Sequence, residues 1–247
     1  MIDDSTLPTS PDPWAFFLDV DGTLIDIAPT PEAVVIPWDL PDMLARLAHR
    51  ADGALAIVSG RPLVSLDRFF APARLPAAGI HGAEMRLPDG RVEAQAAPEF
   101  EAVRSALRAI GDRHAELLVE EKSVSVTIHY RRRPELEPVV RAEIEKIIAG
   151  VSGLALQPGK MMLEVRPASA DKGRALARFM QNRPFAGRRP LAVGDDLTDE
   201  HMFRIAVDMG GAAVRVGKEP RDTAATAHIA DTESVRRWLS NLSRGPK

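Results

Sequence analysis

Trp14-Ala15-Phe16-Phe17-Leu18-Asp19-Val20-Asp21-Gly22-Thr23-Leu24 is the stretch of the chain that decides its fold. Its first five residues are all apolar and lack helical spacing, which is typical of a strand buried on both faces. The sequence then changes abruptly to charged residues and a glycine. A buried strand that ends in a polar loop is the first unit of a parallel α/β sheet.

The same pattern recurs later in the chain. Further buried strands are expected at residues 53–58, 77–80, 190–193 and 212–216. Polar residues follow two of them, as Ser59-Gly60-Arg61 and as His81-Gly82. Apolar residues from Leu40 to Leu47 recur at helical spacing after the first strand, and a helix is expected to begin near Pro62. The pattern predicts a Rossmann-like α/β core with a parallel sheet.

The middle of the chain has a different pattern. Residues 123–130 alternate between polar and apolar side chains, which is typical of a strand with one covered face. Helices are expected at residues 98–114 and 134–148, and short strands at 154–157 and 161–165. Strands of this kind beside two helices predict a small α+β module inserted into the core.

Composition narrows the classes of protein. The chain has 247 residues, no cysteine, and 32 Lys and Arg against 35 Asp and Glu, a formal net charge of −3. The absence of a basic excess argues against nucleic-acid binding, and the absence of cysteine excludes disulfides and thiolate metal sites. No stretch reaches the roughly 20 apolar residues that span a bilayer, so no membrane association is expected. Residues 1–13 are polar and proline-rich, which predicts a disordered leader before a cytoplasmic protein.

Acidic residues gather at two of the predicted strand ends. Asp19 and Asp21 follow the first strand, and Asp195 follows the strand at 190–193. Loops at the carboxyl ends of parallel strands meet in one crevice, where several carboxylates repel one another unless a cation is present. Oxygen ligands suit Mg²⁺, which binds one or two carboxylates together with the oxygens of a phosphate. The cluster therefore predicts both Mg²⁺ and a phosphate substrate.

Phosphate chemistry suggests a role for each side chain. Asp19 can attack phosphorus as a nucleophile, and Asp21 can protonate the leaving alkoxide and later deprotonate water. Lys172 supplies a fixed positive charge, and the Ser59 hydroxyl can bind the same phosphate. Backbone groups of the loop that contains Val20 and Gly22 can hold phosphate oxygens. Taken singly, each Asp is better explained as a helix cap or turn residue, and the combination of motifs is what favours catalysis.

These motifs resemble those of the haloacid dehalogenase-type phosphatases. Asp19 to Leu24 is similar to their first motif, and Ser59, Lys172 and Gly194-Asp195-Asp196 are similar to the second, third and fourth. The resemblance implies an aspartyl-phosphate mechanism, Mg²⁺ bound by Asp19, Asp21 and Asp195, and Asp199 in support of the metal. It also implies a core domain at residues 14–84 and 168–247 with an inserted cap domain at residues 85–167.

A second resemblance concerns the substrate. Segments similar to those of trehalose-6-phosphate phosphatases are Gly159 to Pro167, Glu120-Glu121-Lys122, His129-Tyr130-Arg131, Ser59-Gly60-Arg61 and Gly79 to Glu84. The resemblance implies that Glu120, Lys122 and Glu164 contact the sugar. It also implies that Arg61 and His81 shape the mouth of the site. The remaining candidates for substrate binding are Gly60 and Lys160. Because Glu121 is a second acid beside Glu120, either of them could face the sugar.

The expected activity is Mg²⁺-dependent hydrolysis of trehalose 6-phosphate to trehalose and phosphate, in trehalose biosynthesis. The alternatives are a phosphatase for sucrose 6-phosphate or mannosyl-3-phosphoglycerate, a phosphosugar-binding regulator without turnover, and a mutase-like phosphotransferase. The expected partner is a small sugar phosphate. A functional link to a trehalose-6-phosphate synthase is left open.

Overall fold

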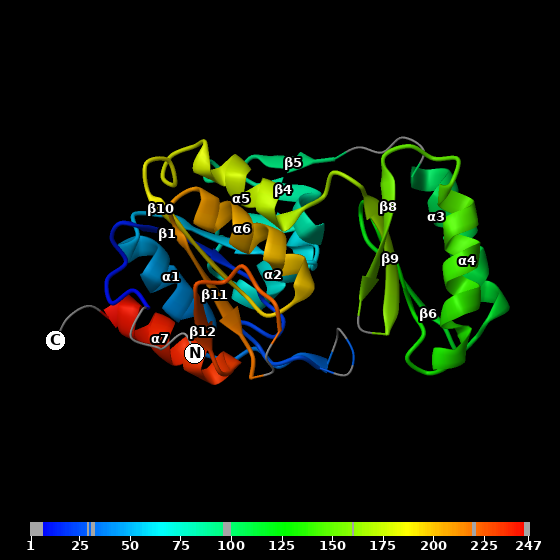
Figure 1. Cartoon of the computed structure of the whole chain (residues 1–247), viewed down its shortest axis with the longest axis horizontal. Coiled ribbons are helices and arrows are strands. Elements are labelled where there is room, and N and C mark those ends of the chain that lie inside the picture. The colour runs from blue at the N-terminus through cyan, green and yellow to red at the C-terminus, as the bar shows by residue number, and fades with distance from the viewer. Residues whose placement is uncertain are drawn as a thin grey trace. The chain divides into compact units, whose positions relative to one another are not determined.

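A computed structural model of the chain describes residues 7–28, 30, 33–95, 100–159, 161–218 and 221–244. The chain divides into two compact units (Figure 1). Unit 1 consists of Met1–Glu93 and Asp171–Lys247, and unit 2 consists of Ala94–Ala170. Among the described residues, no helix is both long and apolar enough to cross a membrane.

Unit 1 is built on an eight-stranded sheet with the order β12-β11-β10-β1-β2-β3-β4-β5. The strands are β1 (Trp14–Leu18), β2 (Leu55–Val58), β3 (Ala77–Gly79), β4 (Glu84–Arg86), β5 (Val92–Ala94), β10 (Arg189–Gly194), β11 (Ala212–Val216) and β12 (Ala227–Ile229). Pairing is parallel from β12 to β3 and antiparallel between β3 and β4. The expected α/β core with a parallel sheet is confirmed.

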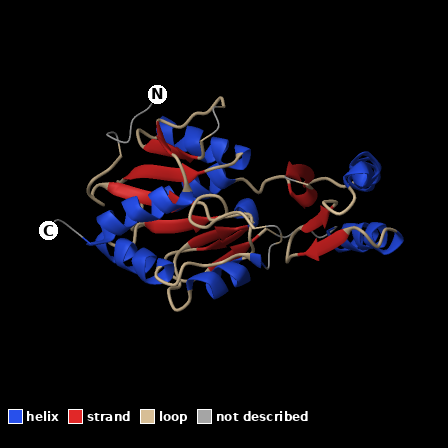
Figure 2. Cartoon of the chain, turned by 90° about the horizontal axis from the view of Figure 1, so that it is seen from below, coloured by secondary structure: helices blue, strands red, loops and turns tan. Residues whose placement is uncertain are grey.

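The strand order reverses between β1 and β10. From β1 the chain proceeds to β2 and β3 on one side, and from β10 it proceeds to β11 and β12 on the other. Helices flank this sheet on both of its faces, as Figure 2 shows. The carboxyl ends of two such central strands form the usual ligand site of an open α/β sheet.

Helices of unit 1 pack in pairs, with α1 against α7 and α5 against α6. They are α1 (Leu40–Arg50), α2 (Leu63–Phe70), α5 (Lys172–Met180), α6 (Glu200–Asp208) and α7 (Thr232–Arg244), with short 3-10 segments η3 (Ile80–Gly82) and η5 (Leu197–Asp199). Phe17 of β1 contacts Phe179 of α5 and Phe185, with ring centroids 5.2 to 6.1 Å apart among the three. This aromatic contact fixes α5 against the strand that carries Asp19.

Part of the segment expected to be a disordered leader lies against unit 1. Trp238 of α7 donates its indole N–H to the carbonyl of Pro8 at 2.9 Å, and Leu7 packs against the hydrophobic core. Residues 1–6 lie outside the described residues. Leu7 and Pro8 thus contact unit 1, and the disordered leader at residues 1–13 stays a prediction.

Unit 2 is a four-stranded antiparallel sheet with the order β6-β7-β9-β8, covered by two helices. Its elements are β6 (Leu118–Glu121), β7 (Val126–His129), β8 (Leu154–Gly159), β9 (Met162–Pro167), α3 (Phe100–Arg113), α4 (Glu137–Ile148) and the 3-10 segment η4 (Pro134–Leu136). One face of the sheet joins the helices in a hydrophobic core that includes Val126, Ile128, Leu163 and Val165.

The boundaries of unit 2 differ from the expected cap at residues 85–167. Unit 2 begins at Ala94 because β4 continues the sheet of unit 1, where Arg86 pairs with Ala77 of β3. Arg86 is buried, and its guanidinium donates to the carbonyl of Leu75 and to Asp67. A buried arginine whose guanidinium nitrogens all have partners is hard to recognise from sequence, because an arginine on a short strand is usually predicted to be exposed.

Candidate active site

Asp19 and Asp195 lie side by side at the point where the strand order reverses. Asp19 directly follows β1 and Asp195 directly follows β10, and these two strands pair in parallel. The backbone N–H of Asp19 donates to the carbonyl of Val193 at 3.0 Å, which extends the ladder to the ends of both strands. The convergence that the sequence predicts for these two carboxylates is thus found in the structure.

Lys172 is held between two carboxylates. It is the first residue of α5, and its Nζ lies 2.7 Å from Oδ1 of Asp19 and 2.7 Å from Oδ1 of Asp199. All three side chains are buried. Burial by itself lowers the pKa of the Lys172 ammonium, but the charges of Asp19 and Asp199 outweigh it and raise the pKa above its usual range. Lys172 therefore stays charged beside Asp19.

Asp199 organises the loop after β10. Its Oδ2 accepts the backbone N–H groups of Asp195 and Asp196 at 3.0 Å each, and Asp196 caps η5 in return. This capping box explains the spacing of Asp195, Asp196 and Asp199 in the sequence. The carboxylate of Asp199 thereby fixes the backbone that presents Asp195 and also contacts Lys172.

Three carboxylates in this region are arranged as a group that could hold a metal ion. Among the described residues, Asp19, Asp195 and Asp199 each offer an oxygen within 4.8 Å of the others. Burial and the charge of Asp199 raise the pKa of Asp195 from 3.8 to about 7. Burial also raises the pKa of Asp19 well above its ordinary value, despite the opposing charge of Lys172. Against three negative charges Lys172 supplies one positive charge, which leaves a formal excess of two that suits a divalent cation.

Gly22 is required by the close approach of the two loops. It has φ of +79°, and a Cβ atom at this position would lie 2.2 Å from Oδ2 of Asp195. Its N–H donates to the carbonyl of Ile25 at 2.8 Å, so that donor is used within the loop. Gly22 thus makes room for Asp195, a reason for the glycine that the sequence does not reveal. Val20, on the same loop, is fully buried.

Asp21 is bound by Arg61 in a bidentate ion pair. Nε and an outer nitrogen of the Arg61 guanidinium lie 2.7 and 2.6 Å from the two carboxylate oxygens of Asp21. The side chain of Asp21 is not among the three that form the potential metal group. Sequence reasoning missed this pair, although the position of Arg61 after the neighbouring strand β2 was a signal for it.

The remaining predicted residues of the core surround the end of β2. Ser59 is buried, and its hydroxyl accepts the N–H of Arg61 at 3.1 Å. The N–H of His81 donates to the carbonyl of Ser59 at 2.9 Å. A Cβ atom on Gly60 would lie 2.8 Å from Nε2 of His81, so a larger residue at position 60 would collide with the imidazole. The structure therefore brings Ser59, Gly60, Arg61 and His81 together beside Asp21.

In unit 2, the sheet face opposite the helices is polar. Glu120 of β6 and Glu164 of β9 both pair with Thr127 of β7, so the three side chains point to the same face. Oε1 of the buried Glu164 accepts hydrogen bonds from Nζ of Lys122 at 3.0 Å and from the hydroxyl of Ser125 at 2.8 Å. The three predicted sugar contacts, Glu120, Lys122 and Glu164, thus belong to one face of the sheet. Lys160, a further candidate for substrate binding, lies outside the described residues.

The register separates Glu120 from Glu121. Oε2 of Glu120 lies 3.1 Å from Nε2 of His129, and this hydrogen bond lowers the pKa of Glu120. Glu121 pairs with Val126, whose side chain lies in the helix-side core, and it binds Arg108 of α3 at 2.7 and 2.8 Å. Glu120 therefore shares the polar face with Glu164, and Glu121 points to the other face.

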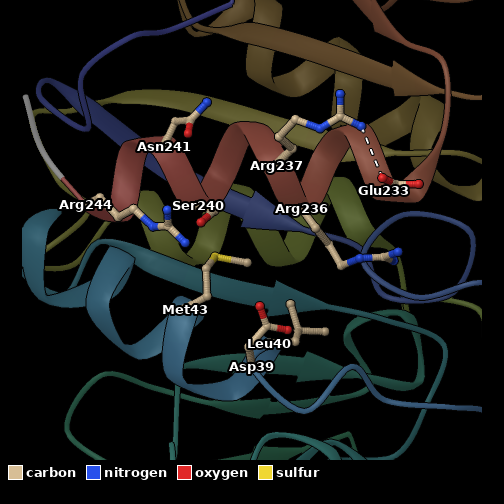
Figure 3. A pocket seen from close by; sticks show the side chains of 9 residues that line it. All are labelled: Asp39, Leu40, Met43, Glu233, Arg236, Arg237, Ser240, Asn241 and Arg244. Atoms are coloured by element: carbon tan, nitrogen blue, oxygen red, sulfur yellow. Dashed lines mark hydrogen bonds and ion pairs between the residues drawn. The ribbon is translucent and has the colours of Figure 1, made fainter.

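A pocket of about 330 Å³ lies elsewhere, between α1 and α7 of unit 1 (Figure 3). Two of its arginines have partners: Arg237 pairs with Glu233, and Arg236 donates to the carbonyl of Leu24. Of the described residues that line it, none is among the predicted catalytic residues. The acidic cluster at the strand ends is the better candidate for the active site.

The fold of this chain is shared with solved structures of a known class of hydrolase. A haloacid dehalogenase-like hydrolase from Bacteroides thetaiotaomicron superposes with a TM-score of 0.68 at 17% identity, over 91% of this chain and 97% of that one. The fold is accordingly that of the haloacid dehalogenase-like hydrolases, as predicted.

The family follows from sequence. The model of the trehalose-phosphatase family matches residues 17–233. The chain is 43% identical to a probable trehalose-phosphate phosphatase of Sinorhizobium fredii, over 97% of this chain and 91% of that one. It is 37% identical to the trehalose-6-phosphate phosphatase of Escherichia coli, over 93% of this chain and 86% of that one. This chain belongs to the trehalose-phosphatase family, which confirms the predicted family and the enzyme class of phosphoric monoester hydrolases.

Proposed function

We propose that the protein is a Mg²⁺-dependent phosphatase that hydrolyses trehalose 6-phosphate to trehalose and phosphate, with Asp19 as the nucleophile. The observation that carries the chemistry is the placement of Lys172 Nζ at 2.7 Å from both Asp19 and Asp199. The names of the relatives in Sinorhizobium fredii and Escherichia coli support the substrate.

In the first step a carboxylate oxygen of Asp19 attacks phosphorus, and the bond from phosphorus to the sugar oxygen breaks. The charge of Lys172 favours the ionised form of the attacking carboxylate and orients it, and it offsets the charge that develops on the phosphoryl group. Asp21 gives a proton to the leaving sugar oxygen. The products of this step are trehalose and an aspartyl-phosphate at position 19.

In the second step water attacks the phosphorus of the aspartyl-phosphate. Asp21, now ionised, accepts a proton from that water, and the bond from phosphorus to Asp19 breaks. Phosphate leaves and the Asp19 carboxylate is restored. When Asp21 is ionised, as it is in this second step, Arg61 orients it, because a bidentate guanidinium fixes the plane of a carboxylate.

Asp19, Asp195 and Asp199 fit a divalent cation by their oxygen chemistry and their excess negative charge. In the proposal Asp19 and Asp195 hold Mg²⁺, Asp199 supports them, and the backbone carbonyl of Asp21 is a further ligand. When bound, the ion would neutralise phosphate oxygens and lower the cost of bringing a phosphate dianion to a carboxylate.

Recognition of the sugar is assigned to the polar sheet face of unit 2, which would act as an inserted cap. Carboxylates and an ammonium group are good partners for sugar hydroxyls. Glu120, Lys122 and Glu164 are held there by cross-strand hydrogen bonds, so they are oriented before the substrate binds. Lys160 belongs to the same proposal on the basis of the family resemblance.

The test is a phosphate-release screen across trehalose 6-phosphate, sucrose 6-phosphate, mannosyl-3-phosphoglycerate and glucose 6-phosphate, with Mg²⁺ and with a chelator. We expect kcat/KM for trehalose 6-phosphate to exceed the others by at least about 100-fold and to disappear on chelation. A similar rate on all four esters would reject the substrate, and full activity after chelation would reject the metal.

A further inference from the structure

Two polar contacts join the start of α5 to the segment formed by η5 and the start of α6. The first is the buried bond between Lys172 Nζ and Asp199. In the second, Nδ1 of His201 lies 2.6 Å from Oδ2 of Asp171. Asp171 immediately precedes Lys172, and His201 follows Asp199 by two residues. The second contact therefore links the same two segments as the first and lies next to it.

Asp171 also fixes the first turn of α5. It is the N-cap residue, and its Oδ1 accepts the backbone N–H of Arg174 at 2.8 Å. Such a cap defines where the helix begins, and Lys172 is the first residue after it. One carboxylate oxygen of Asp171 thus acts within α5, while the other binds His201 on α6.

The backbones around Lys172 are closely packed. A Cβ atom on Gly173 would lie 2.9 Å from the carbonyl oxygen of His201, and one on Gly82 would lie 3.0 Å from that of Asp171. Close-packed segments transmit a displacement to their neighbours. A shift of Asp171 or His201 would therefore be passed on to the backbone of Lys172.

We propose that His201 is a positioning residue for Lys172: its imidazole holds Asp171, and with it the first turn of α5, so that Lys172 Nζ reaches Asp19 and Asp199 together. The inference rests on the proposed function, because Lys172 affects turnover only if Asp19 reacts. A charged imidazole is not needed, since Nδ1 carries a proton in one neutral tautomer as well. His201 acts through Asp171 and does not itself touch the reacting atoms.

The test compares three variants of the full chain. His201→Leu removes the donor, and His201→Asn keeps an N–H group near the position of Nδ1. Asp171→Ser keeps a capping oxygen but is too short to reach His201. Each variant is assayed with trehalose 6-phosphate and with p-nitrophenyl phosphate, so that loss of sugar recognition is separated from loss of phosphate chemistry.

We expect kcat on both esters to fall on the order of 10-fold in His201→Leu and in Asp171→Ser, with KM changed less than about twofold. His201→Asn should recover most of the loss. The double variant Asp171→Ser/His201→Leu should be no slower than the worse single variant, because both changes break the same contact.

Arg178→Leu is the matched control. Arg178 lies on the same helix and pairs with Glu93 at 3.1 Å, with both side chains part-exposed as in the pair of His201 and Asp171. The Arg178→Leu variant should leave kcat unchanged.

Variants that have a lower melting temperature, but that keep the wild-type kcat at temperatures below it, would overturn the inference. Additive losses in the double variant would overturn it too. A wild type active on p-nitrophenyl phosphate but not on trehalose 6-phosphate would reject only the proposed substrate, whereas a wild type inactive on both would reject both proposals.

Discussion

The guanidinium of Arg61 binds both carboxylate oxygens of Asp21, at 2.7 and 2.6 Å. Arg61 follows β2 and Asp21 follows β1, so the pair joins the ends of two neighbouring strands. The ring of Phe69 lies 4.8 Å below the same guanidinium. Arg61 is thus held on two sides, and it holds in turn the side chain that we propose as general acid and base.

Replacement of Arg61 tests this orientation. Arg61→Ala should lower kcat by about 10- to 100-fold, because the carboxylate of Asp21 loses its fixed plane. Arg61→Lys should recover only part of the activity, since an ammonium cannot bind both oxygens in the same way. Steady-state kinetics would show the difference. Arg68→Ala, an exposed arginine on α2, is the control, and equal activity of Arg61→Ala and this control would contradict the assignment.

Removal of the buried ammonium should damage both folding and catalysis. Lys172→Met leaves Asp19 and Asp199 without their shared partner, and loss of one member of a buried ion pair costs about 3 to 5 kcal/mol. We expect a fall of this order in the free energy of unfolding, measured by urea denaturation without metal, together with undetectable turnover. A variant that is inactive but as stable as the wild type would show that the ammonium is not required to balance these carboxylates.

The raised pKa values make a prediction for metal binding. Because the pKa of Asp195 is about 7 in the metal-free folded chain and 3.8 ordinarily, folding keeps this group protonated between these values. Its contribution to stability therefore falls as pH rises from about 4 to 7. Mg²⁺ needs the ionised form, so it should raise the melting temperature more at pH 8 than at pH 5.5. Asp195→Asn should reduce this difference, because only the raised pKa of Asp19 then opposes binding at low pH. An equal shift at both pH values in the wild type would refute the prediction.

The two adjacent acids of β6 provide a matched pair for sugar recognition. Glu120→Gln should raise KM for trehalose 6-phosphate about 10-fold or more and leave hydrolysis of p-nitrophenyl phosphate unchanged. Glu121→Gln should change neither, because Glu121 binds Arg108 on the other face of the sheet. The opposite result, with Glu121 sensitive and Glu120 not, would mean that the sugar contacts lie on the helix side.

Much of the candidate active site in unit 1 could be predicted, because the residues that mark the ends of buried strands are also the residues of the site. An apolar run that stops at Asp19 or at Asp195 marks both a buried strand and its polar end, and parallel strands bring such ends together. Pairing between particular side chains was harder to predict: neighbouring strand ends place Asp21 and Arg61 in the same region, but the sequence does not show that they form an ion pair. Likewise, the choice between Glu120 and Glu121 depends on a register of one residue, which sets the face that each occupies.

The most direct test of the central claim is to trap the phosphorylated enzyme. During turnover of trehalose 6-phosphate with Mg²⁺, the reaction is quenched in acid, reduced with borohydride and analysed by peptide mass spectrometry. We predict that Asp19, and no other carboxylate, is converted to the reduced alcohol, that the conversion requires substrate, and that Asp19→Asn abolishes both the label and turnover. Rapid hydrolysis with no modification at position 19, or an active Asp19→Asn variant, would contradict the account.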